Sequence, residues 1–209
     1  MTAVRRAGAP DDVYTVALSA IAVSHIAHYL SVIALYRLSV NVFGAETSTC
    51  RLTCFLSAAL HVISPAGAFL SAPYAEPVFS FLNLAGFYIY SSSLWDRHNG
   101  NRATADAKLL LSAMFFTFGT TMRSNGILSG FFFVCDAVSQ LHEIWSHGVS
   151  VNACLHLATI VVGGCLVGFG MVLPQLIAYM TYCSSGTVSR PWCTWIPPSI
   201  YTWVQTYYW

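Results

Sequence analysis

The sequence predicts an all-α protein, a polytopic bundle of about six transmembrane helices. Hydrophobic residues make up 56% of the 209 positions and charged residues only 8%. A soluble domain of this size usually carries about 25% charged residues, so lipid must solvate much of this surface. The formal net charge of +1 argues against a nucleic-acid partner, because such partners are bound by strongly basic surfaces.

Six apolar segments follow a polar leading segment over residues 1–12. A hydrocarbon core about 30 Å thick requires about 20 helical residues, and several of these segments reach that length. We treat residues 1–209 as a single membrane domain, part of a longer one, with transmembrane helices over residues 13–183. The expected spans are residues 13–43, 52–72, 77–94, 109–122, 127–144 and 151–183.

Proline and glycine interrupt two of these spans. Pro65 predicts a kink in the second span, and Gly163-Gly164 with Pro174 suggests that the sixth is a broken helix. Residues 96–108 (DRHNGNRATADAK) are the clearest soluble loop, and residues 184–209 are rich in Trp and Tyr. We interpret this tail as an aromatic loop on the luminal side of the membrane rather than a span.

The seven cysteines have no spacing typical of a metal site. Most lie in apolar segments, where a thiol packs as a small side chain. Cys183 and Cys193 flank one loop, and a disulfide between them is left open, because it depends on whether that loop faces an oxidising lumen.

Three polar motifs lie between apolar segments: SAPYAE at residues 71–76, RSNG at 123–126 and RPWC at 190–193. Counting the intervening spans places all three motifs at one membrane face. The other face has slightly more basic residues, so the positive-inside rule makes it cytosolic. The start of the sequence then lies on the non-cytosolic side, which predicts an upstream segment with at least one more span. The basic residues of the cytosolic face are Arg37, Arg51, Arg97, Arg102 and Lys108.

An acid and two arginines at one face predict a site for a polar or anionic substrate. Glu76 either complements the start of a helix or hydrogen-bonds a sugar hydroxyl. Arg123 either extends from a tight turn to the headgroups or binds a phosphate. Arg190 stands near Trp192 and Tyr201, which form either an interfacial belt or a surface for a lipid-linked sugar phosphate.

Other ionisable residues have simpler interpretations. Asp136, inside the fifth span, either hydrogen-bonds a neighbouring helix or marks a functional site. His61 and His156 are interpreted as packed, hydrogen-bonded histidines. Trp95-Asp96 stands on the cytosolic face among basic residues, where a solvated position is expected. The sequence gives no ligand set for a metal.

At the three motifs the sequence resembles the GPI mannosyltransferase 2 family, whose members add the second mannose of the GPI anchor in the endoplasmic reticulum. The matching stretches are HVISPAGAFLSAPYAEPVFSFLNLAGFYIY from His61, RSNGILSGFF from Arg123 and RPWCTWIPPSIYTWVQTYYW from Arg190. They occur in the family's order over residues 14–209. Each is weak alone, and their combination is specific.

The resemblance implies a GT-C type membrane fold and a multi-pass location in the endoplasmic reticulum membrane. It implies transfer from dolichyl-phosphate-mannose to a mannosyl-GPI lipid intermediate at the luminal face, forming an α-1,6 link. No cofactor or metal is expected, and an accessory membrane subunit is a further expected partner. Arg123 and Arg190 would stabilise the departing phosphate, and Tyr74 and Glu76 would orient the sugar. The substrate-binding residues implied are Ser71, Tyr74, Glu76, Arg123, Asn125, Arg190, Trp192 and Tyr201.

The catalytic acid is unassigned. Family members carry a luminal loop with a Trp-Asp pair before the region matched here, and this is where the acid is expected. The present sequence lacks that segment, so we expect an internal piece that is inactive alone. Two other functions are kept as alternatives: a non-catalytic membrane scaffold subunit, and a transporter of lipid-linked sugars, for which broken helices are the usual indication.

Overall fold

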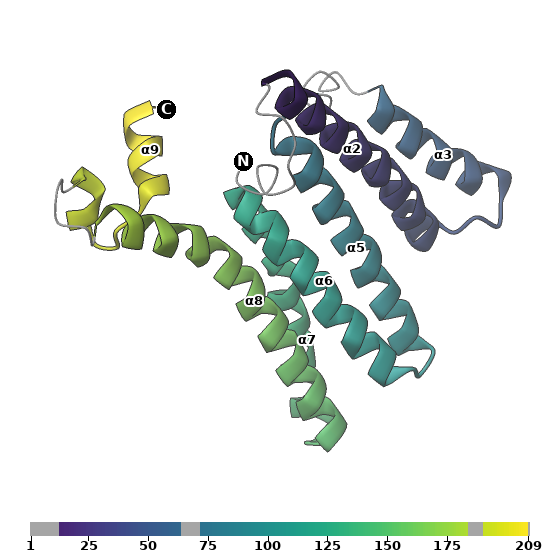
Figure 1. Ribbon diagram of the computed structural model, residues 1–209. Coiled ribbons are helices and arrows are strands. Elements are labelled where there is room, and N and C mark those ends of the chain that lie inside the picture. Colours follow the sequence, from purple (N-terminus) through teal and green to yellow (C-terminus); the bar gives the residue numbers. More distant parts are fainter. Residues whose placement is uncertain (1–12, 64–71, 184–189, 209) are drawn as a thin grey trace.

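The structure, a computed structural model, describes residues 13–63, 72–183 and 190–208, and every regular element in these residues is helical (Figure 1). The all-α prediction is therefore confirmed. The long helices are α2 (Val13–Phe43), α3 (Ser48–Val62), α5 (Glu76–His98), α6 (Arg102–Met122), α7 (Gly130–His147) and α8 (Val151–Tyr182). Short helices are η1 (Ser124–Ser129), η2 (Pro191–Thr194) and α9 (Ile200–Tyr208).

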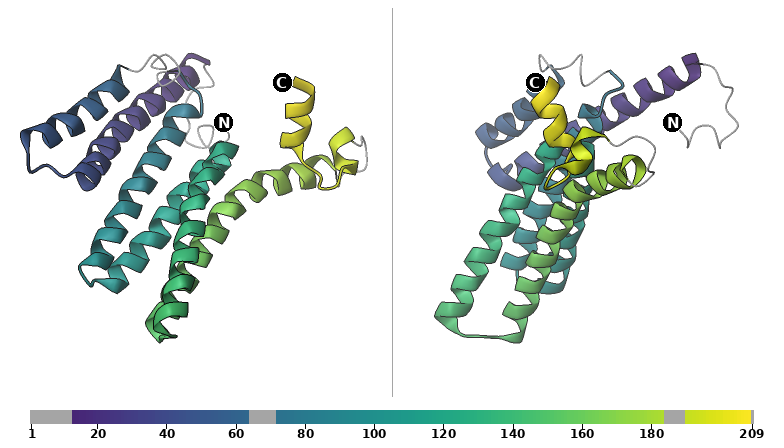
Figure 2. Two further views of the ribbon diagram at one scale, coloured as in Figure 1. Left: turned by 180° about the vertical axis from the view of Figure 1, so that it is seen from behind. Right: turned by 90° about the vertical axis from the view of Figure 1, so that its left-hand side faces the viewer.

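The long helices pack side by side in the order α3, α2, α5, α6, α8, α7, which departs from the chain order in its first pair and in its last pair. Helix α2 contacts α3 and α5, α5 contacts α6, α6 contacts α8, and α8 contacts α7 (Figures 1 and 2). Successive helices run in opposite directions, as short connections require. The start of α5 and the end of α6 therefore lie at one end of the bundle, and the α5–α6 and α7–α8 turns lie at the other.

Within the described residues, three helical stretches are long and apolar enough to cross a membrane: Tyr14–Phe43, Ser124–His147 and Val151–Tyr182. The six predicted spans are thus confirmed in part. Helices α5 and α6 have 23 and 21 residues but carry more polar side chains. Both are central and pack against protein on two sides, so they need less apolar surface than a lipid-facing helix.

The soluble loop predicted over residues 96–108 is wrong. Helix α5 continues to His98, α6 begins at Arg102, and only a three-residue turn joins them. Gly100 allows this turn because its φ is +84°, a value that other residues adopt rarely. The charges that suggested a loop pair across the turn, with Lys108 Nζ 2.7 Å from Asp96 Oδ2.

The predicted break in the sixth span is also wrong, because α8 is one continuous helix of 32 residues. Gly163 serves close packing, since a Cβ there would lie 2.5 Å from Cε1 of Phe133 on α7. Pro174 lies inside the helix, and its missing N–H leaves a carbonyl one turn earlier without its helical bond. The last turns of α8 bend away from α6 (Figures 1 and 2).

The second predicted span is helical over Ser48–Val62, and Pro65 with its predicted kink lies outside the described residues. The tail predicted as a loop contains the two short helices η2 and α9. A disulfide joins Cys183 to Cys193, which decides the pairing that the sequence had left open.

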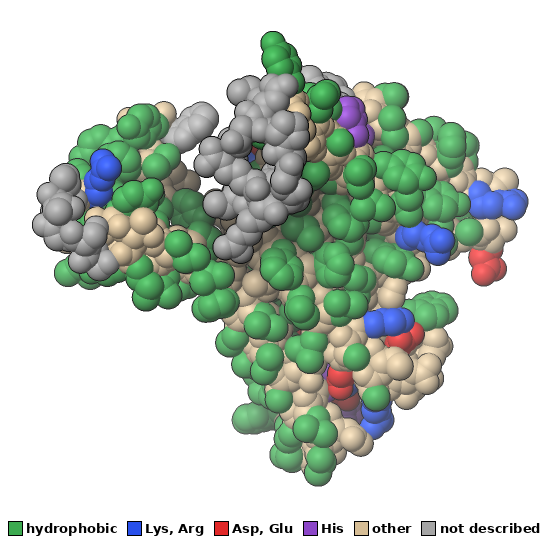
Figure 3. Space-filling model, in the orientation of Figure 1, with side chains coloured by type: hydrophobic (Ala, Val, Ile, Leu, Met, Phe, Trp, Pro, Cys, Tyr) green, Lys and Arg blue, Asp and Glu red, His purple; other side chains and the backbone are tan. Residues whose placement is uncertain are grey.

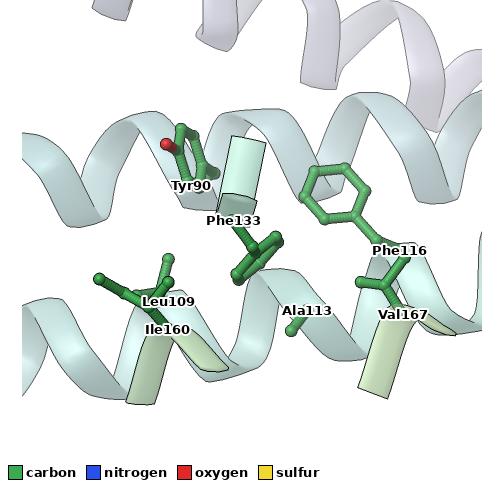
Figure 4. Close-up of a cluster of buried hydrophobic side chains, with 7 residues drawn as sticks. All are labelled: Tyr90, Leu109, Ala113, Phe116, Phe133, Ile160 and Val167. Atoms are coloured by element: carbon green, nitrogen blue, oxygen red, sulfur yellow. The ribbon is translucent and has the colours of Figure 1, made fainter. Parts of the chain in front are cut away.

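The core lies where α5, α6, α7 and α8 meet (Figure 4). Phe116 and Phe133 are almost fully buried and meet edge to face, with ring centroids 6.3 Å apart. Hydrophobic side chains also cover most of the outer face seen in Figure 3, as expected for a protein solvated by lipid. The buried cluster consists of Tyr90, Leu109, Ala113, Phe116, Phe133, Ile160 and Val167.

Candidate functional site

The candidate site lies where α5 begins and α6 ends. Pro77 stands in the first turn of α5, where its missing N–H costs nothing, and Glu76 is the first residue of the helix. A carboxylate at this position is favoured by the partial positive charge of the helix start. Helix α6 ends when Arg123 turns to an extended backbone conformation, which projects its side chain away from the helix axis toward α5.

Glu76 and Arg123 form an ion pair. Arg123 Nη1 donates to Glu76 Oε1 over 3.0 Å, although the two residues are 47 positions apart in sequence. The Arg123 guanidinium also lies over the ring of Phe79, 5.8 Å from its centroid. The side chains of Arg123 and Glu76 are 41% and 34% exposed, so both groups are open to a ligand. The prediction that these two motifs share one face is confirmed.

The segment after Arg123 is fixed by close packing. A tight turn at RSNG was one of two expectations from the sequence, and the structure forms the 3₁₀ helix η1 over Ser124–Ser129. Gly126 is buried there, and a Cβ would lie 2.7 Å from the backbone of Thr120. Ser129 Oγ, at the end of η1, donates to Asn83 Oδ1 on α5 over 2.8 Å. These contacts hold the end of α6 against α5 and so position Arg123.

The other residues predicted near this pair have less defined surroundings. Tyr74 is 60% exposed and precedes Glu76 by two residues. Asn125 is exposed on η1. Ser71 lies outside the described residues. Their roles in binding a substrate stay predictions.

Arg190 and its aromatic neighbours belong to a separate segment that α8 carries. Arg190 lies over the ring of Tyr182, at the end of α8, with its guanidinium carbon 5.9 Å from the centroid. Trp192 is buried in η2, with 3% of its surface exposed, and Tyr201 is partly buried on α9. In the described part of the chain, no hydrogen bond, ion pair or ring contact joins Arg190 to the Glu76–Arg123 pair. A common site for both arginines stays a prediction.

Sequence reasoning missed two residues that organise the pair, Phe79 and Asn83. Both lie on the face of α5 that carries Glu76, at positions three and seven residues later. This helical spacing was a usable indication, but only the structure shows that the facing element is the end of α6.

The simpler interpretations of three ionisable residues are confirmed. Asp136 Oδ2 accepts a hydrogen bond of 2.7 Å from the Tyr90 hydroxyl on α5. His156 Nδ1 lies 2.6 Å from Asp106 Oδ1, and His61 Nε2 lies 3.0 Å from Ser31 Oγ. Among the described residues, no three His, Cys, Asp or Glu side chains gather in a way that could hold a metal ion.

The geometry of the pair suits recognition of a phosphate and a hydroxyl together. A guanidinium presents several N–H donors in a plane that matches phosphate oxygens, and one of them is used by Glu76. The carboxylate can accept further hydrogen bonds from a sugar hydroxyl. The pair is electrically neutral, so an incoming anion competes with Glu76 for Arg123.

Comparison with known proteins identifies the family. The family described as mannosyltransferase (PIG-V) matches residues 13–209. The chain is similar to GPI mannosyltransferase 2 of Aspergillus oryzae, with 56% identity over 92% of the chain and 44% of the relative. It is also similar to the proteins of that name in Aspergillus fumigatus (52% identity over 86% of the chain and 41% of the relative) and Gibberella zeae (36%, 92% and 44%). No solved structure matches the chain.

The chain spans less than half the length of these curated relatives. The family match, in contrast, covers nearly the whole chain and includes the Glu76–Arg123 pair and the disulfide-linked tail. The chain therefore belongs to the mannosyltransferase (PIG-V) family.

Proposed function

We propose that this chain forms the donor-phosphate part of a mannosyltransferase that adds the second mannose, through an α-1,6 link, to the GPI-anchor precursor. The donor is dolichyl-phosphate-mannose, and the reaction takes place at the luminal face of the endoplasmic reticulum. The observation that carries the proposal is the exposed Glu76–Arg123 pair at one end of the bundle, in a chain whose curated relatives are named GPI mannosyltransferase 2.

The two side chains have different roles in the proposed reaction. The donor phosphate replaces Glu76 as the partner of Arg123, which then stabilises the negative charge that develops as the bond from the anomeric carbon to the phosphate oxygen breaks. Glu76, released from the pair, accepts a hydrogen bond from a sugar hydroxyl. The acceptor 6-hydroxyl attacks the anomeric carbon with inversion, and its proton passes to a carboxylate that we assign to a segment outside this chain.

The disulfide supports the luminal orientation. Disulfides persist in oxidising compartments and are rare in the cytosol. Cys183 follows directly after α8, and the end of α8 lies at the same end of the bundle as the start of α5 and the end of α6 (Figure 1). A membrane position with the pair and the disulfide in the lumen agrees with the small excess of basic residues on the opposite face.

The test uses a chimaera in which this chain replaces the matching 192 residues of the Aspergillus oryzae relative. Microsomes that contain the chimaera receive labelled dolichyl-phosphate-mannose and a mannosyl-GPI acceptor. We expect a labelled glycolipid from which an α-1,6-specific mannosidase releases the labelled mannose. When the synthesis of dolichyl-phosphate-mannose is blocked, we expect no product from labelled GDP-mannose. Transfer only from GDP-mannose, or a linkage that resists the mannosidase, would refute the proposal.

The alternatives make other predictions for the same membranes. The transporter hypothesis rested on a broken sixth span, and α8 is continuous. A scaffold subunit would tolerate replacement of Glu76 and Arg123 without loss of transfer. An accessory subunit would be revealed by a protein that co-purifies with the chimaera and is required for transfer.

A further inference from the structure

The backbone of Arg123 is held in place more firmly than its side chain. Its N–H donates to the carbonyl oxygen of Gly119 over 3.0 Å, and its own carbonyl oxygen accepts from the N–H of Gly126 over 2.9 Å. In the part of the chain that the structure describes, the guanidinium has two partners, the Glu76 carboxylate and the Phe79 ring. The direction of this long side chain therefore depends on those two contacts.

The ring of Phe79 is itself well placed to support the guanidinium. Phe79 follows Glu76 by three residues on α5, so the two side chains lie on the same face of the helix. On α6 it faces Gly119, where a Cβ would lie 3.8 Å from Cδ2 of Phe79. Because Gly119 has no side chain, the half-buried ring can lie close to the α6 backbone, one helical turn before Arg123.

The two partners of Arg123 interact with different features of the guanidinium. The Glu76 carboxylate accepts a hydrogen bond from Nη1. The Phe79 ring attracts the cation through the negative face of its π system and accepts no hydrogen bond from it. The ring therefore leaves the remaining N–H groups free for an anion, and a phosphate can replace the carboxylate while the ring contact is kept.

This difference matters when the donor binds. In the proposed function the donor phosphate displaces Glu76 from Arg123, and the present inference rests on that exchange. The ring contact is then the protein contact that still orients the guanidinium. A flexible arginine side chain loses rotamer freedom when a phosphate orders it, and a donor group that is already oriented stabilises developing charge better than one that must first be ordered.

We propose that Phe79 is a positioning residue, which holds the Arg123 guanidinium in the phosphate-binding direction while the donor takes the place of Glu76. Phe79 acts through Arg123 and does not react with the donor. Its effect depends on the charge distribution of the ring as well as on the volume of the side chain. This dependence separates a positioning role from a role in helix packing alone.

The first test changes the charge distribution of the ring and nearly keeps its shape. In the chimaera, Phe79 is replaced by 4-fluorophenylalanine or 3,4,5-trifluorophenylalanine, because fluorine withdraws electron density from the ring face. We expect the kcat of mannose transfer to fall stepwise, by about five- to tenfold with three fluorines, as the attraction for the cation weakens. The amount of folded protein should not change.

Phe81 is the matched control for fluorination. It also lies on α5 and also meets a ring of α6, that of Phe115, edge to face with centroids 6.3 Å apart. The same fluorinated residues at Phe81 should leave kcat unchanged. A kcat that does not depend on the number of fluorines at Phe79, or that falls equally at Phe81, would overturn the proposal.

Natural substitutions supply a second, independent test. Phe79→Tyr keeps the ring and should keep kcat within about twofold, whereas Phe79→Leu should lower it by about tenfold per folded molecule. In an Arg123→Ala background, Phe79→Leu should cause no further loss, because the two residues act as one unit. A second tenfold loss in that background would show that the ring acts by another route. If Phe79→Leu fails to fold, the fluorinated rings still decide the question.

The Arg123→Ala variant separates failure of this inference from failure of the proposed function. If Arg123→Ala transfers mannose normally, Arg123 does not hold the donor phosphate, and both proposals are wrong. If Arg123→Ala loses transfer while the fluorinated Phe79 rings have no effect, the phosphate role of Arg123 stands and only the positioning role of Phe79 is refuted.

Discussion

Replacing Arg123 by alanine separates a structural role of the Glu76–Arg123 pair from a catalytic one. The structural loss can be worked out from the contacts. The ion pair joins partly exposed groups 3.0 Å apart, and such pairs contribute about 0.2–1 kcal/mol. The contact of the guanidinium with the Phe79 ring adds about 0.5–1 kcal/mol. Arg123→Ala should therefore lower the free energy of unfolding by about 1–2 kcal/mol.

A catalytic role predicts a much larger effect on mannose transfer. Removing one group that stabilises transition-state charge usually lowers kcat by about 10²–10³-fold, equivalent to about 3–4 kcal/mol. The assay is the rate of transfer by the chimaera at saturating dolichyl-phosphate-mannose, normalised to the amount of folded protein. Arg102→Ala is the matched control, because Arg102 is an exposed arginine at the opposite end of the same helix.

The reasoning is refuted if Arg123→Ala keeps transfer within about threefold of the unmodified chimaera while the Tm falls. That result would show that the pair only joins α5 to α6. A fall of similar size in Arg102→Ala would indicate a general defect in insertion, and the activity of neither variant could then be assigned to phosphate binding.

Three further predictions follow from the same end of the bundle. Exchanging the pair as Glu76→Arg with Arg123→Glu should restore most of the stability lost in either single variant but not mannose transfer; recovery of transfer would show that only the pairing matters. Gly126→Ala should cost about 1–3 kcal/mol of stability, because its Cβ would lie 2.7 Å from the Thr120 backbone. Gly168→Ala is the control in the same thermal unfolding assay: its Cβ would lie more than 4 Å from any neighbouring helix, and alanine favours a helix over glycine, so stability should not fall. Cys193→Ser should lower stability by about 3 kcal/mol through the loss of a loop of 10 residues, and an unchanged unfolding midpoint would mean that the bridge does not form in the membrane.

The sequence was sufficient for the class of fold and for the common face of two motifs, because both depend on counting apolar segments. It was not sufficient to predict the extent of helices in which charged residues form ion pairs with one another. Asp96 and Lys108 appeared to require a loop, yet they pair across a short turn between two helices. A high density of charged residues indicates a solvated loop only where those charges have no partners in the folded chain, and the sequence does not show which charges pair.

Small residues misled the interpretation of α8 for a related reason. Gly163 would weaken an isolated helix, and so it suggested a break. In the folded chain the absence of a side chain lets Phe133 lie against the backbone of α8, and this packing more than offsets the lower helix propensity. Pro174 has the expected local effect, a bend, but a bend does not require the helix to end. The sequence pattern alone does not distinguish these outcomes, since they depend on which helix lies opposite.

The orientation in the membrane can be tested at both ends of the bundle at once. The background is a chain whose five free cysteines are replaced by alanine, with the Cys183–Cys193 bridge kept. Asn101→Cys then places a thiol in the α5–α6 turn, and Asn125→Cys places one at an exposed position on η1. If Arg123 and the bridge face the lumen, a membrane-impermeant maleimide should label the first variant in sealed microsomes and the second only after detergent. The reverse pattern would place the disulfide in the cytosol, where reduction is expected, and the proposed luminal reaction would have to be abandoned even if Arg123 proved essential.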